Sequence, residues 1–334
     1  MSDMHGSRSL NKASGESAPK RHQVAAAVHR SGFVCLIGRP NAGKSTLTNA
    51  LVGAKVAITS SKPQTTRHAV RGIITRPDAQ LVVIDTPGLS KPRSLLQERL
   101  NDLVRDTYAE VDVVAVCLPA DQHVGPGDKY LIAELAALAR RPKLVAFATK
   151  ADKVSGERMR RHLLQIDALQ AELGIEWEHI VPCSALSGAQ MDEVAEVLIS
   201  LLPEGPVYYP GGELSDEPDE VLAAELIREA ALESVRDELP HSITVEIIEM
   251  GTRDDPGVKR PVLEIYANLI VERESQKHIM IGKAGERIKQ VGTDARRAIS
   301  ALLGAPTRLD LRVKVVKEWQ RDPKALNKLG FEAR

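Results

Sequence analysis

The chain has 334 residues, of which 43% are hydrophobic, and its 45 lysines and arginines balance its 45 aspartates and glutamates. This length predicts two or three domains, each able to bury a core. Three cysteines without CxxC spacing argue against a disulfide framework and a zinc site, and no apolar stretch reaches the length of a membrane span. We therefore expect a soluble, cytoplasmic protein.

The charge is unevenly distributed along the chain. Residues 211–256 hold 14 Asp and Glu against 3 Lys and Arg, whereas residues 257–334 hold 17 Lys and Arg against 9 Asp and Glu. A basic C-terminal part that coincides with a binding loop indicates a polyanionic partner. Residues 1–30 lack the apolar core of a signal peptide, and we expect them to form a disordered leader.

Residues 38–45 carry the first motif with a defined chemistry, Gly38-Arg39-Pro40-Asn41-Ala42-Gly43-Lys44-Ser45, which satisfies the GxxxxGKS of a P-loop. Its glycines let backbone N–H groups face phosphate oxygens, Lys44 reaches the outer phosphates, and the Ser45 hydroxyl holds Mg²⁺. A predicted strand over 33–37 and helix over 45–52 aim the helix N-terminus at the anion, and Thr46 is included in the predicted nucleotide site. The alternative is a glycine turn that only joins strand to helix.

Apolar strand patterns alternate with helical patterns through residues 31–202. This alternation predicts a mostly parallel sheet with helices on both faces, the α/β fold of a P-loop domain. The predicted strands cover 72–75, 81–84, 113–118, 144–149 and 180–184, and the predicted helices cover 95–109, 128–139, 157–173 and 191–202. Ligands of such sheets bind beyond the carboxyl ends of the strands, where the remaining motifs fall.

Two further segments are predicted to respond to the γ-phosphate. The motif Asp85-Thr86-Pro87-Gly88 follows a strand, so that Asp85 holds a water of the Mg²⁺ shell and Gly88 offers its N–H to the γ-phosphate. Taken alone this motif is equally typical of a turn, but it lies 40 residues after the P-loop. Residues 64–68 form a polar loop in which a threonine hydroxyl completes the Mg²⁺ shell, and we prefer Thr66 over Thr65.

The base is predicted to be guanine. Asp152, in Thr149-Lys150-Ala151-Asp152, accepts from the N1–H and the exocyclic amine of guanine, whereas adenine has no matching donors. The usual pattern is NKxD, and Thr149 departs from it by losing an amide that supports the base and neighbouring loops. The backbone of Cys183-Ser184-Ala185 is predicted to contact guanine O6.

The residue after the Asp85–Gly88 motif is Leu89, where Ras-like proteins carry a glutamine that orients the attacking water. The chain therefore resembles the hydrophobically substituted GTPases, in which K⁺, held partly by a P-loop asparagine, does the work of an arginine finger. Asn41 has that position, and the predicted catalytic set is Asn41, Lys44, Thr66 and Gly88. The alternative role for Asn41 is to stabilise the loop.

A Pro- and Gly-rich acidic linker at 203–220 separates a second domain at 221–318 from the first. Its pattern is helix 221–238, strand 242–250, strand 262–271, helix 275–281, GxxG, helix 286–303 and strand 309–316, the α+β order of a type II KH domain. Glycines at 282 and 285 let an RNA backbone approach. The predicted RNA-binding residues are Ile281, Gly282, Lys283, Ala284, Gly285, Arg287 and Lys289. A helix cap is the alternative for the four-residue motif alone.

The order of these motifs resembles the bacterial Era family of GTPases over residues 31–334. The resemblance includes Ala223-Ala224-Glu225-Leu226-Ile227-Arg228-Glu229, Arg236-Asp237-Glu238-Leu239-Pro240 and a tail at 319–334. It implies slow GTP hydrolysis with Mg²⁺, binding of the 16S rRNA 3′ end and a role in 30S subunit maturation. It also implies that nucleotide state gates RNA binding. The protein is expected to be a monomer, and some family members associate with the inner face of the cell membrane.

Three alternatives remain open from the sequence. Leu89 and Thr149 are compatible with an RNA-binding scaffold whose nucleotide site hardly turns over. A related translational GTPase, acting for example in tRNA modification, is disfavoured by the KH-like half. A P-loop ATPase is disfavoured by Asp152.

Overall fold

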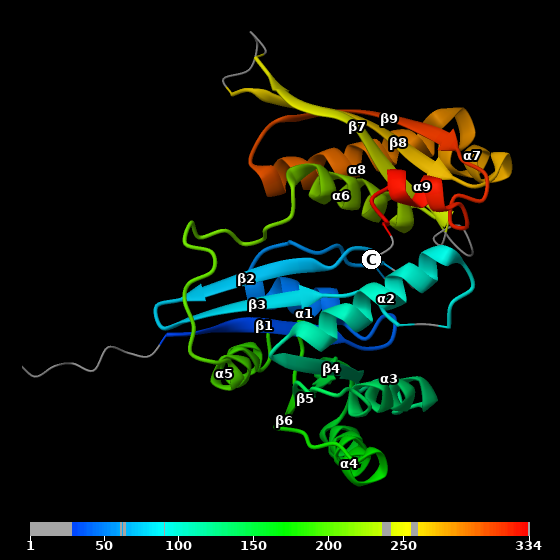
Figure 1. The fold of residues 1–334 in the computed structure, drawn as a ribbon. Helices are drawn as coiled ribbons and strands as arrows, with labels where there is room; N and C mark the ends of the chain where they lie inside the picture. The colour runs from blue at the N-terminus through cyan, green and yellow to red at the C-terminus, as the bar shows by residue number, and fades with distance from the viewer. Residues whose placement is uncertain are drawn as a thin grey trace, which may run out of the picture.

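The computed structural model describes residues 29–60, 62, 65–89, 91–235, 242–254 and 260–332. Residues 1–28 of the predicted 1–30 leader, Gln64 of the polar loop and the 236–240 motif lie outside the described residues. Two bodies are stacked on each other, with the N-terminal sheet below and the C-terminal sheet above in Figure 1. Among the helices that the structure describes, none has the length and hydrophobicity that a bilayer crossing requires.

The lower body is built on a six-stranded sheet in the order β2-β3-β1-β4-β5-β6, in which only the β2–β3 pair is antiparallel. The strands are β1 (Arg30–Ile37), β2 (Val70–Arg76), β3 (Ala79–Asp85), β4 (Val113–Pro119), β5 (Lys143–Thr149) and β6 (His179–Pro182). The helices are α1 (Lys44–Val52), α2 (Leu95–Glu110), α3 (Pro126–Ala136), α4 (Gly156–Leu173) and α5 (Met191–Leu201). The predicted mostly parallel α/β sheet is confirmed.

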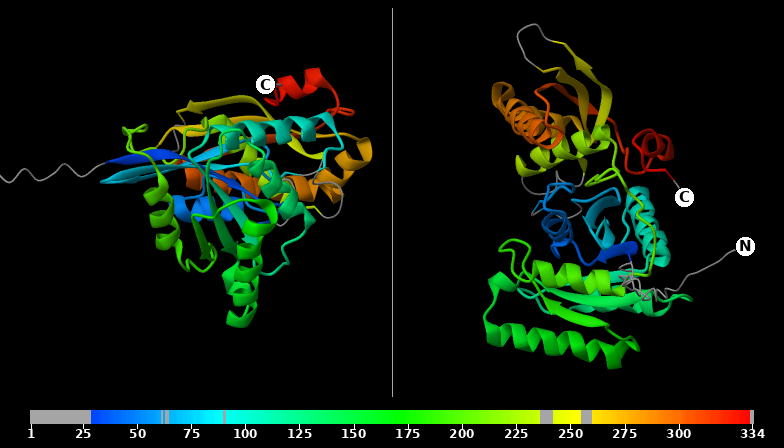
Figure 2. Two further views of the ribbon diagram at one scale, coloured as in Figure 1. Left: turned by 60° about the horizontal axis from the view of Figure 1, so that its bottom comes forward. Right: turned by 90° about the vertical axis from the view of Figure 1, so that its left-hand side faces the viewer.

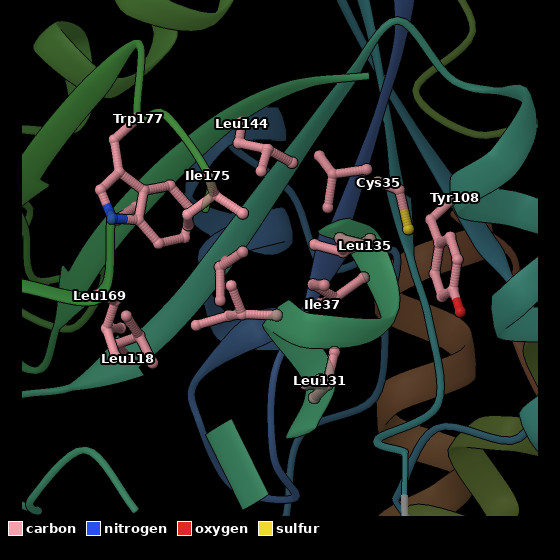
Figure 3. Close-up of a cluster of buried hydrophobic side chains, with 14 of the residues drawn as sticks. Cys35, Ile37, Tyr108, Leu118, Leu131, Leu135, Leu144, Leu169, Ile175 and Trp177 are labelled. Atoms are coloured by element: carbon pink, nitrogen blue, oxygen red, sulfur yellow. The ribbon is translucent and has the colours of Figure 1, made fainter. Parts of the chain in front are cut away.

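The central strands are buried because helices cover both faces of the sheet. Every residue of β3 and β4 is buried, which matches their continuous apolar runs. One face packs on α2, α3 and α4, and Figure 3 shows Tyr108, Leu131 and Leu169 from these helices around Cys35 and Leu118. The other face packs on α1 and α5. This packing fixes the carboxyl ends of the strands, where the predicted motifs lie.

The upper body has the element order predicted for a type II KH domain. It consists of α6 (Asp219–Glu233), β7 (Thr244–Arg253), β8 (Val262–Val271), α7 (Glu274–Ile281), α8 (Glu286–Leu303) and β9 (Thr307–Val315). The sheet order is β7-β8-β9, with β7 and β8 antiparallel and β8 and β9 parallel. Figure 1 shows α6 and α8 on the side of this sheet that faces the lower body, and their apolar residues form its core.

Two segments join the bodies. The linker runs along the edge of the lower sheet, where Leu214 accepts a 2.9 Å hydrogen bond from the N–H of Ile73 in β2 (Figure 2). Beyond β9, the chain returns to the lower body and forms a short helix, α9 (Pro323–Lys328), which the sequence analysis did not predict. Trp319 and Phe331 of this tail are buried with Leu96 and Leu100 of α2. The tail therefore packs between the two bodies.

Candidate nucleotide site and RNA-binding loop

The P-loop connects β1 to α1, and some of its residues have a positive φ, which most residue types disfavour. Gly43 caps α1 with φ 96°, and Asn41 has φ 62°. A side chain at Gly38 would bring its Cβ within 2.8 Å of the Cys117 carbonyl oxygen. Lys44 is 6% exposed and donates to the carbonyl oxygens of Gly38 at 3.2 Å and Arg39 at 3.4 Å. Burial lowers the pKa of Lys44. The N–H groups at the N-terminus of α1 form a site suited to a phosphate anion.

Two adjoining cavities open at this loop. The larger, of about 710 Å³, is lined by P-loop residues 40–46, by Thr65, Thr66 and Gly88, and by Gln122. The smaller, of about 180 Å³, is lined by Thr149, Asp152 and residues 183–185. Both share Gly43, Thr46, Lys150, Lys153 and Leu186. The predicted phosphate-binding and base-binding residues thus surround two parts of one site, whose larger part has a volume typical of ligand pockets.

Three oxygen-bearing side chains predicted to surround a metal ion lie together. The Ser45 hydroxyl is 3.0 Å from that of Thr66, which donates to Asp85 Oδ2 at 3.1 Å. Asp85 is fully buried, which raises its pKa, and its Oδ1 makes no hydrogen bond within the described part of the chain. One carboxylate and two hydroxyls suit Mg²⁺, which usually keeps waters and phosphate oxygens as its other ligands. This donor set fits the predicted ion.

The structure distinguishes the two threonines of the polar loop. Thr66 is 8% exposed and faces Ser45 and Asp85. The Thr65 hydroxyl instead donates a 2.7 Å hydrogen bond to the Lys62 carbonyl oxygen. The geometry therefore supports the preference for Thr66 as the hydroxyl ligand.

The segment after β3 rests against the P-loop. The Thr86 hydroxyl donates to the Leu36 carbonyl oxygen at 2.9 Å, and a Cβ at Gly88 would lie 3.0 Å from the Pro40 nitrogen. Glycine thus allows this close approach without a shift of the P-loop backbone. Leu89 packs on the hydrophobic cluster beneath the sheet. Its side chain has no polar atom and packs away from the nucleotide site, so it does not orient a water.

In the base pocket, Asp152 is oriented by a neighbouring hydroxyl. Ser184 donates to Asp152 Oδ1 at 2.5 Å and accepts from the Ser187 N–H at 3.2 Å. The Ala151 N–H donates to the Cys183 carbonyl oxygen at 3.1 Å, which ties the two loops together. From the sequence, residues 183–185 are predicted to contact the base through their backbone only. The side chain of Ser184 was missed because nothing in the sequence shows that these two loops meet.

The expectation that Thr149 loses the support of the neighbouring loop is wrong. Its hydroxyl donates a 2.7 Å hydrogen bond to the Ala42 carbonyl oxygen of the P-loop. A hydroxyl at this distance from the backbone makes the link that the sequence analysis attributed to an asparagine amide.

A P-loop tether was also missed. Arg39 donates from Nε to Asp128 Oδ1 at 2.7 Å, and Asp128 is 2% exposed at the start of α3. The second oxygen of Asp128 accepts from the Gly125 N–H at 2.8 Å. Arg39 thus holds the loop to α3, and its place in the motif gave no signal of this partner.

The GxxG loop connects α7 to α8 and presents its two middle residues to solvent. Gly282 has φ 73° and Gly285 φ 79°, and a Cβ at Gly282 would lie 2.8 Å from that of Arg287. Lys283 and Ala284 are exposed, as is Lys289 on α8. Ile281 is half-buried. Arg287 donates to the Ile279 carbonyl oxygen and so braces the loop.

A P-loop, a buried Mg²⁺-type donor set and a carboxylate in the base pocket, joined to a KH fold, define a GTPase with a C-terminal KH domain. Two family models match the chain accordingly: "50S ribosome-binding GTPase" over residues 33–150 and "KH domain" over residues 238–320.

Curated relatives identify the particular family. GTPase Era of Nocardioides sp. is 62% identical over 91% of this chain and 96% of its own length, and GTPase Era of Streptomyces coelicolor is 60% identical over 92% and 97%. The chain belongs to the Era GTPase family.

Solved structures agree with this assignment. A single-residue variant of Aquifex aeolicus Era bound to GDP·AlF₄⁻ matches with 35% identity and a TM-score of 0.84 over 91% of this chain and 99% of that one. Era in complex with MgGDPNP and nucleotides 1506–1542 of 16S ribosomal RNA matches with 36% identity, the same TM-score and the same coverage.

Proposed function

We propose that this protein binds and hydrolyses GTP with Mg²⁺ and binds the 3′ region of 16S rRNA in the assembly of the 30S subunit. The observation that carries the proposal is the 36% identical Era whose structure contains both MgGDPNP and nucleotides 1506–1542 of 16S rRNA. It matches this chain over both bodies at a TM-score of 0.84. One family model names the 50S subunit, but it covers only residues 33–150 and leaves out the KH domain.

The roles of the site residues follow from their placement. Lys44 and the backbone of residues 38–46 bind the phosphates, and Asp152, held by Ser184, selects guanine. Mg²⁺ bound near Ser45, Thr66 and Asp85 would supply charge neutralisation at the γ-phosphate. Gly88 offers its N–H to that phosphate. Thr66 lies in a different loop from Ser45 and Asp85. Contact of its hydroxyl with Mg²⁺ while the γ-phosphate is present would therefore fix the position of the polar loop.

Nucleotide state is proposed to gate RNA binding, since the loop that carries Thr66 contacts both bodies. K⁺ is proposed to bind at Asn41, which has φ 62° in the P-loop, and to accelerate hydrolysis. Position 89 is leucine, so no glutamine is present there to orient the attacking water. The RNA contacts are assigned to Lys283, Ala284 and Lys289, which are exposed, with Ile281, both loop glycines and Arg287 forming the loop.

The predicted division of the chain is kept as part of this proposal: 31–202 for the GTPase domain, 203–220 for the linker, 221–318 for the KH domain and 319–334 for the tail. A peripheral location at the inner face of the cell membrane stays a prediction. Co-sedimentation with vesicles of anionic lipid tests it, and recovery of all protein in the supernatant would contradict it.

Fluorescence anisotropy of a labelled RNA with the sequence of nucleotides 1506–1542 tests the proposed function. The RNA is titrated with protein bound to a non-hydrolysable GTP analogue and, separately, with protein bound to GDP. We expect tighter binding in the GTP state and its loss in Lys283→Asp/Ala284→Asp, whose side chains are exposed. Substituting Gly282 is a poorer control, because a Cβ there meets Arg287.

Three outcomes would change the assignment. Equal RNA binding with both nucleotides, together with single-turnover hydrolysis no faster than that of free GTP, would favour the RNA-binding scaffold. Absence of binding to this RNA would favour a related translational GTPase. A preference for ATP over GTP would overturn the role of Asp152.

A further inference from the structure

The 223–229 motif on α6 has no part in the site described so far, although it contains three buried charged residues. Glu225 is 9%, Arg228 1% and Glu229 8% exposed. Burying ions on a helix is costly unless each is paired and hydrogen-bonded. Arg228 and Glu229 bond to the connection between α1 and β2 of the GTPase domain, whereas Ala223, Leu226 and Ile227 of the same helix pack in the KH core.

Arg228 connects α6 to this loop through a fixed guanidinium. Its Nε and Nη2 donate to the two carboxylate oxygens of Glu225 at 2.9 Å and 2.5 Å. A two-pronged pair of this kind fixes the plane of the guanidinium. The same Nη2 also donates to the Thr65 carbonyl oxygen. Burial alone would raise the pKa of Glu225, but the Arg228 charge and hydrogen bonds lower it, so the pair stays ionised.

The Thr65 carbonyl belongs to the peptide bond that leads into Thr66. This unit is planar, so a donor that holds the carbonyl restrains the plane from which Thr66 extends. Thr66 in turn places its hydroxyl 3.0 Å from that of Ser45 and 3.1 Å from Asp85 Oδ2. A side chain of the KH domain therefore acts on the metal site through one peptide group.

The rest of α6 holds the same connection between α1 and β2 at a second point, residues 55–60. Glu229 accepts from the Thr59 N–H at 2.9 Å and forms an ion pair with Lys55. Glu233 accepts a 2.6 Å hydrogen bond from the Ser60 hydroxyl. Residues four apart lie on one face of a helix, so Glu225, Glu229 and Glu233 form one row directed at the loop.

The residue after Thr66 is also held by the KH domain. Arg67 is 1% exposed, donates to the Ile243 carbonyl oxygen at 2.7 Å and lies 5.5 Å from the ring centre of Trp319. Thr66 thus stands between two residues that are both bonded to the C-terminal body. Its hydroxyl position depends on how that body is docked.

We propose that Arg228 is a positioning residue for GTP hydrolysis, supplied by the RNA-binding domain to hold Thr66 in the Mg²⁺ site. The inference rests on the proposed GTPase function and deepens it. High affinity for Mg²⁺ in the presence of GTP then requires that α6 contacts the loop that carries Thr66. A partner that displaces α6 slows hydrolysis without entering the nucleotide site.

The test compares the full-length wild type with Arg228→Met, Arg228→Lys and Arg312→Met. Arg312 is the matched control, because it pairs with Asp310 in the same domain at 3.3 Å and 3.2 Å but lies at an exposed position of β9. Two quantities are measured: the Mg²⁺ concentration that gives half the maximal single-turnover rate, and the affinity for a fluorescent GDP in EDTA. The GDP affinity reports whether the nucleotide domain is folded.

We expect Arg228→Met to raise the half-saturating Mg²⁺ concentration by about tenfold or more, as residues that orient metal ligands do. Arg228→Lys should recover part of this loss, since it keeps the charge but not the two-pronged pair. GDP affinity in EDTA and the Arg312→Met variant should match the wild type.

An unchanged Mg²⁺ dependence in both Arg228 variants would overturn the inference while leaving the proposed function intact. So would a loss of GDP affinity in EDTA equal to the loss of rate, because Arg228 would then only stabilise the fold. A wild type that hydrolyses no GTP refutes the proposed function itself, and the inference with it.

Discussion

The hydroxyl of Thr149 donates a 2.7 Å hydrogen bond to the carbonyl oxygen of Ala42, so the base-binding loop is joined directly to the P-loop. Thr149 is 5% and Ala42 1% exposed. A buried carbonyl that loses its donor keeps the full cost of its desolvation. The link therefore matters for the relative position of the two halves of the nucleotide site.

Thr149→Val tests this link, because valine keeps the shape and removes the donor. We expect about 1–3 kcal/mol of lost binding free energy for GDP and GTP alike, or roughly 5- to 150-fold in Kd. Titration of a fluorescent GDP measures it. Thr149→Ser keeps the hydroxyl and serves as the control; equal affinities for the Val and Ser variants would contradict the proposed role.

Ser184→Ala should weaken guanine selection while leaving phosphate binding in place. The Ser184 hydroxyl donates to Asp152 Oδ1 at 2.5 Å, and without it the carboxylate loses the hydrogen bond that orients it. The measurement is the ratio of GDP to ADP affinity, which should fall. Ser187→Ala is the control, since Ser187 reaches Ser184 through its backbone N–H. A ratio that stays at the wild-type value would show that Asp152 needs no such support.

Thr66→Ala and Thr65→Ala should differ in their response to Mg²⁺. Thr66 faces Ser45 and Asp85, whereas the Thr65 hydroxyl bonds to Lys62. We expect Thr66→Ala to lose Mg²⁺-dependent affinity for a GTP analogue, with GDP affinity kept. Binding titrations over a range of Mg²⁺ concentrations measure this. The assignment of the metal-binding hydroxyl fails if Thr65→Ala shows the larger loss.

Hydrolysis should be faster in KCl than in NaCl at equal ionic strength. Leu89 packs on the core and provides no group to orient water, so the cation beside Asn41 is expected to supply the missing charge. Single-turnover rates measure the effect, and Asn41→Ala should abolish the difference between the salts. Equal rates of the wild type in both salts would remove K⁺ from the mechanism.

Stability should decrease as the pH falls below about 6.5, the usual pKa of histidine. Burial lowers the pKa of His68 and of His162. Glu225 opposes the shift at His68, while Arg228 and Arg67 add to it. Because both rings are protonated more easily in the unfolded chain, protons favour unfolding from about pH 6.5 down to the folded-state pKa.

Thermal unfolding between about pH 7.5 and 5.5 measures this effect. His68→Gln and His162→Gln should each unfold with a smaller dependence on pH than the wild type. His179→Gln, at an exposed position of β6, should change nothing. The expectation is contradicted if the wild type and the double variant show the same change in Tm over this range.

The sequence predicted the parts of the site that belong to short motifs with a fixed spacing of residues. The P-loop, Asp85, Asp152 and the GxxG loop lie between the predicted strands and helices, because hydrophobic periodicity and glycine positions encode local structure. Contacts between distant segments left no such pattern. Ser184 with Asp152, Arg39 with Asp128 and Arg228 with Thr65 each join distant segments whose meeting depends on the whole fold.

The tail shows the same limit more clearly. Residues 319–331 looked like an appendage of the KH strand, and the short helix α9 within them is only six residues long. Trp319 and Phe331 are buried in one cluster with Leu96 and Leu100 of α2 and Ile270 of β8. Periodicity in a single short segment does not reveal a partner that is more than 200 residues away in the chain.

The position of Arg228 and the tail late in the chain imposes an order on synthesis. The nucleotide domain emerges first and can fold as a unit, while Thr65 and Thr66 have no partner from α6 until residues near 228 appear. His68 stacks on Phe331 with ring centres 5.0 Å apart, a contact that is completed later still. At about 5–20 residues per second, the nascent protein spends on the order of seconds with a nucleotide pocket but without the contacts of Arg228 and Phe331.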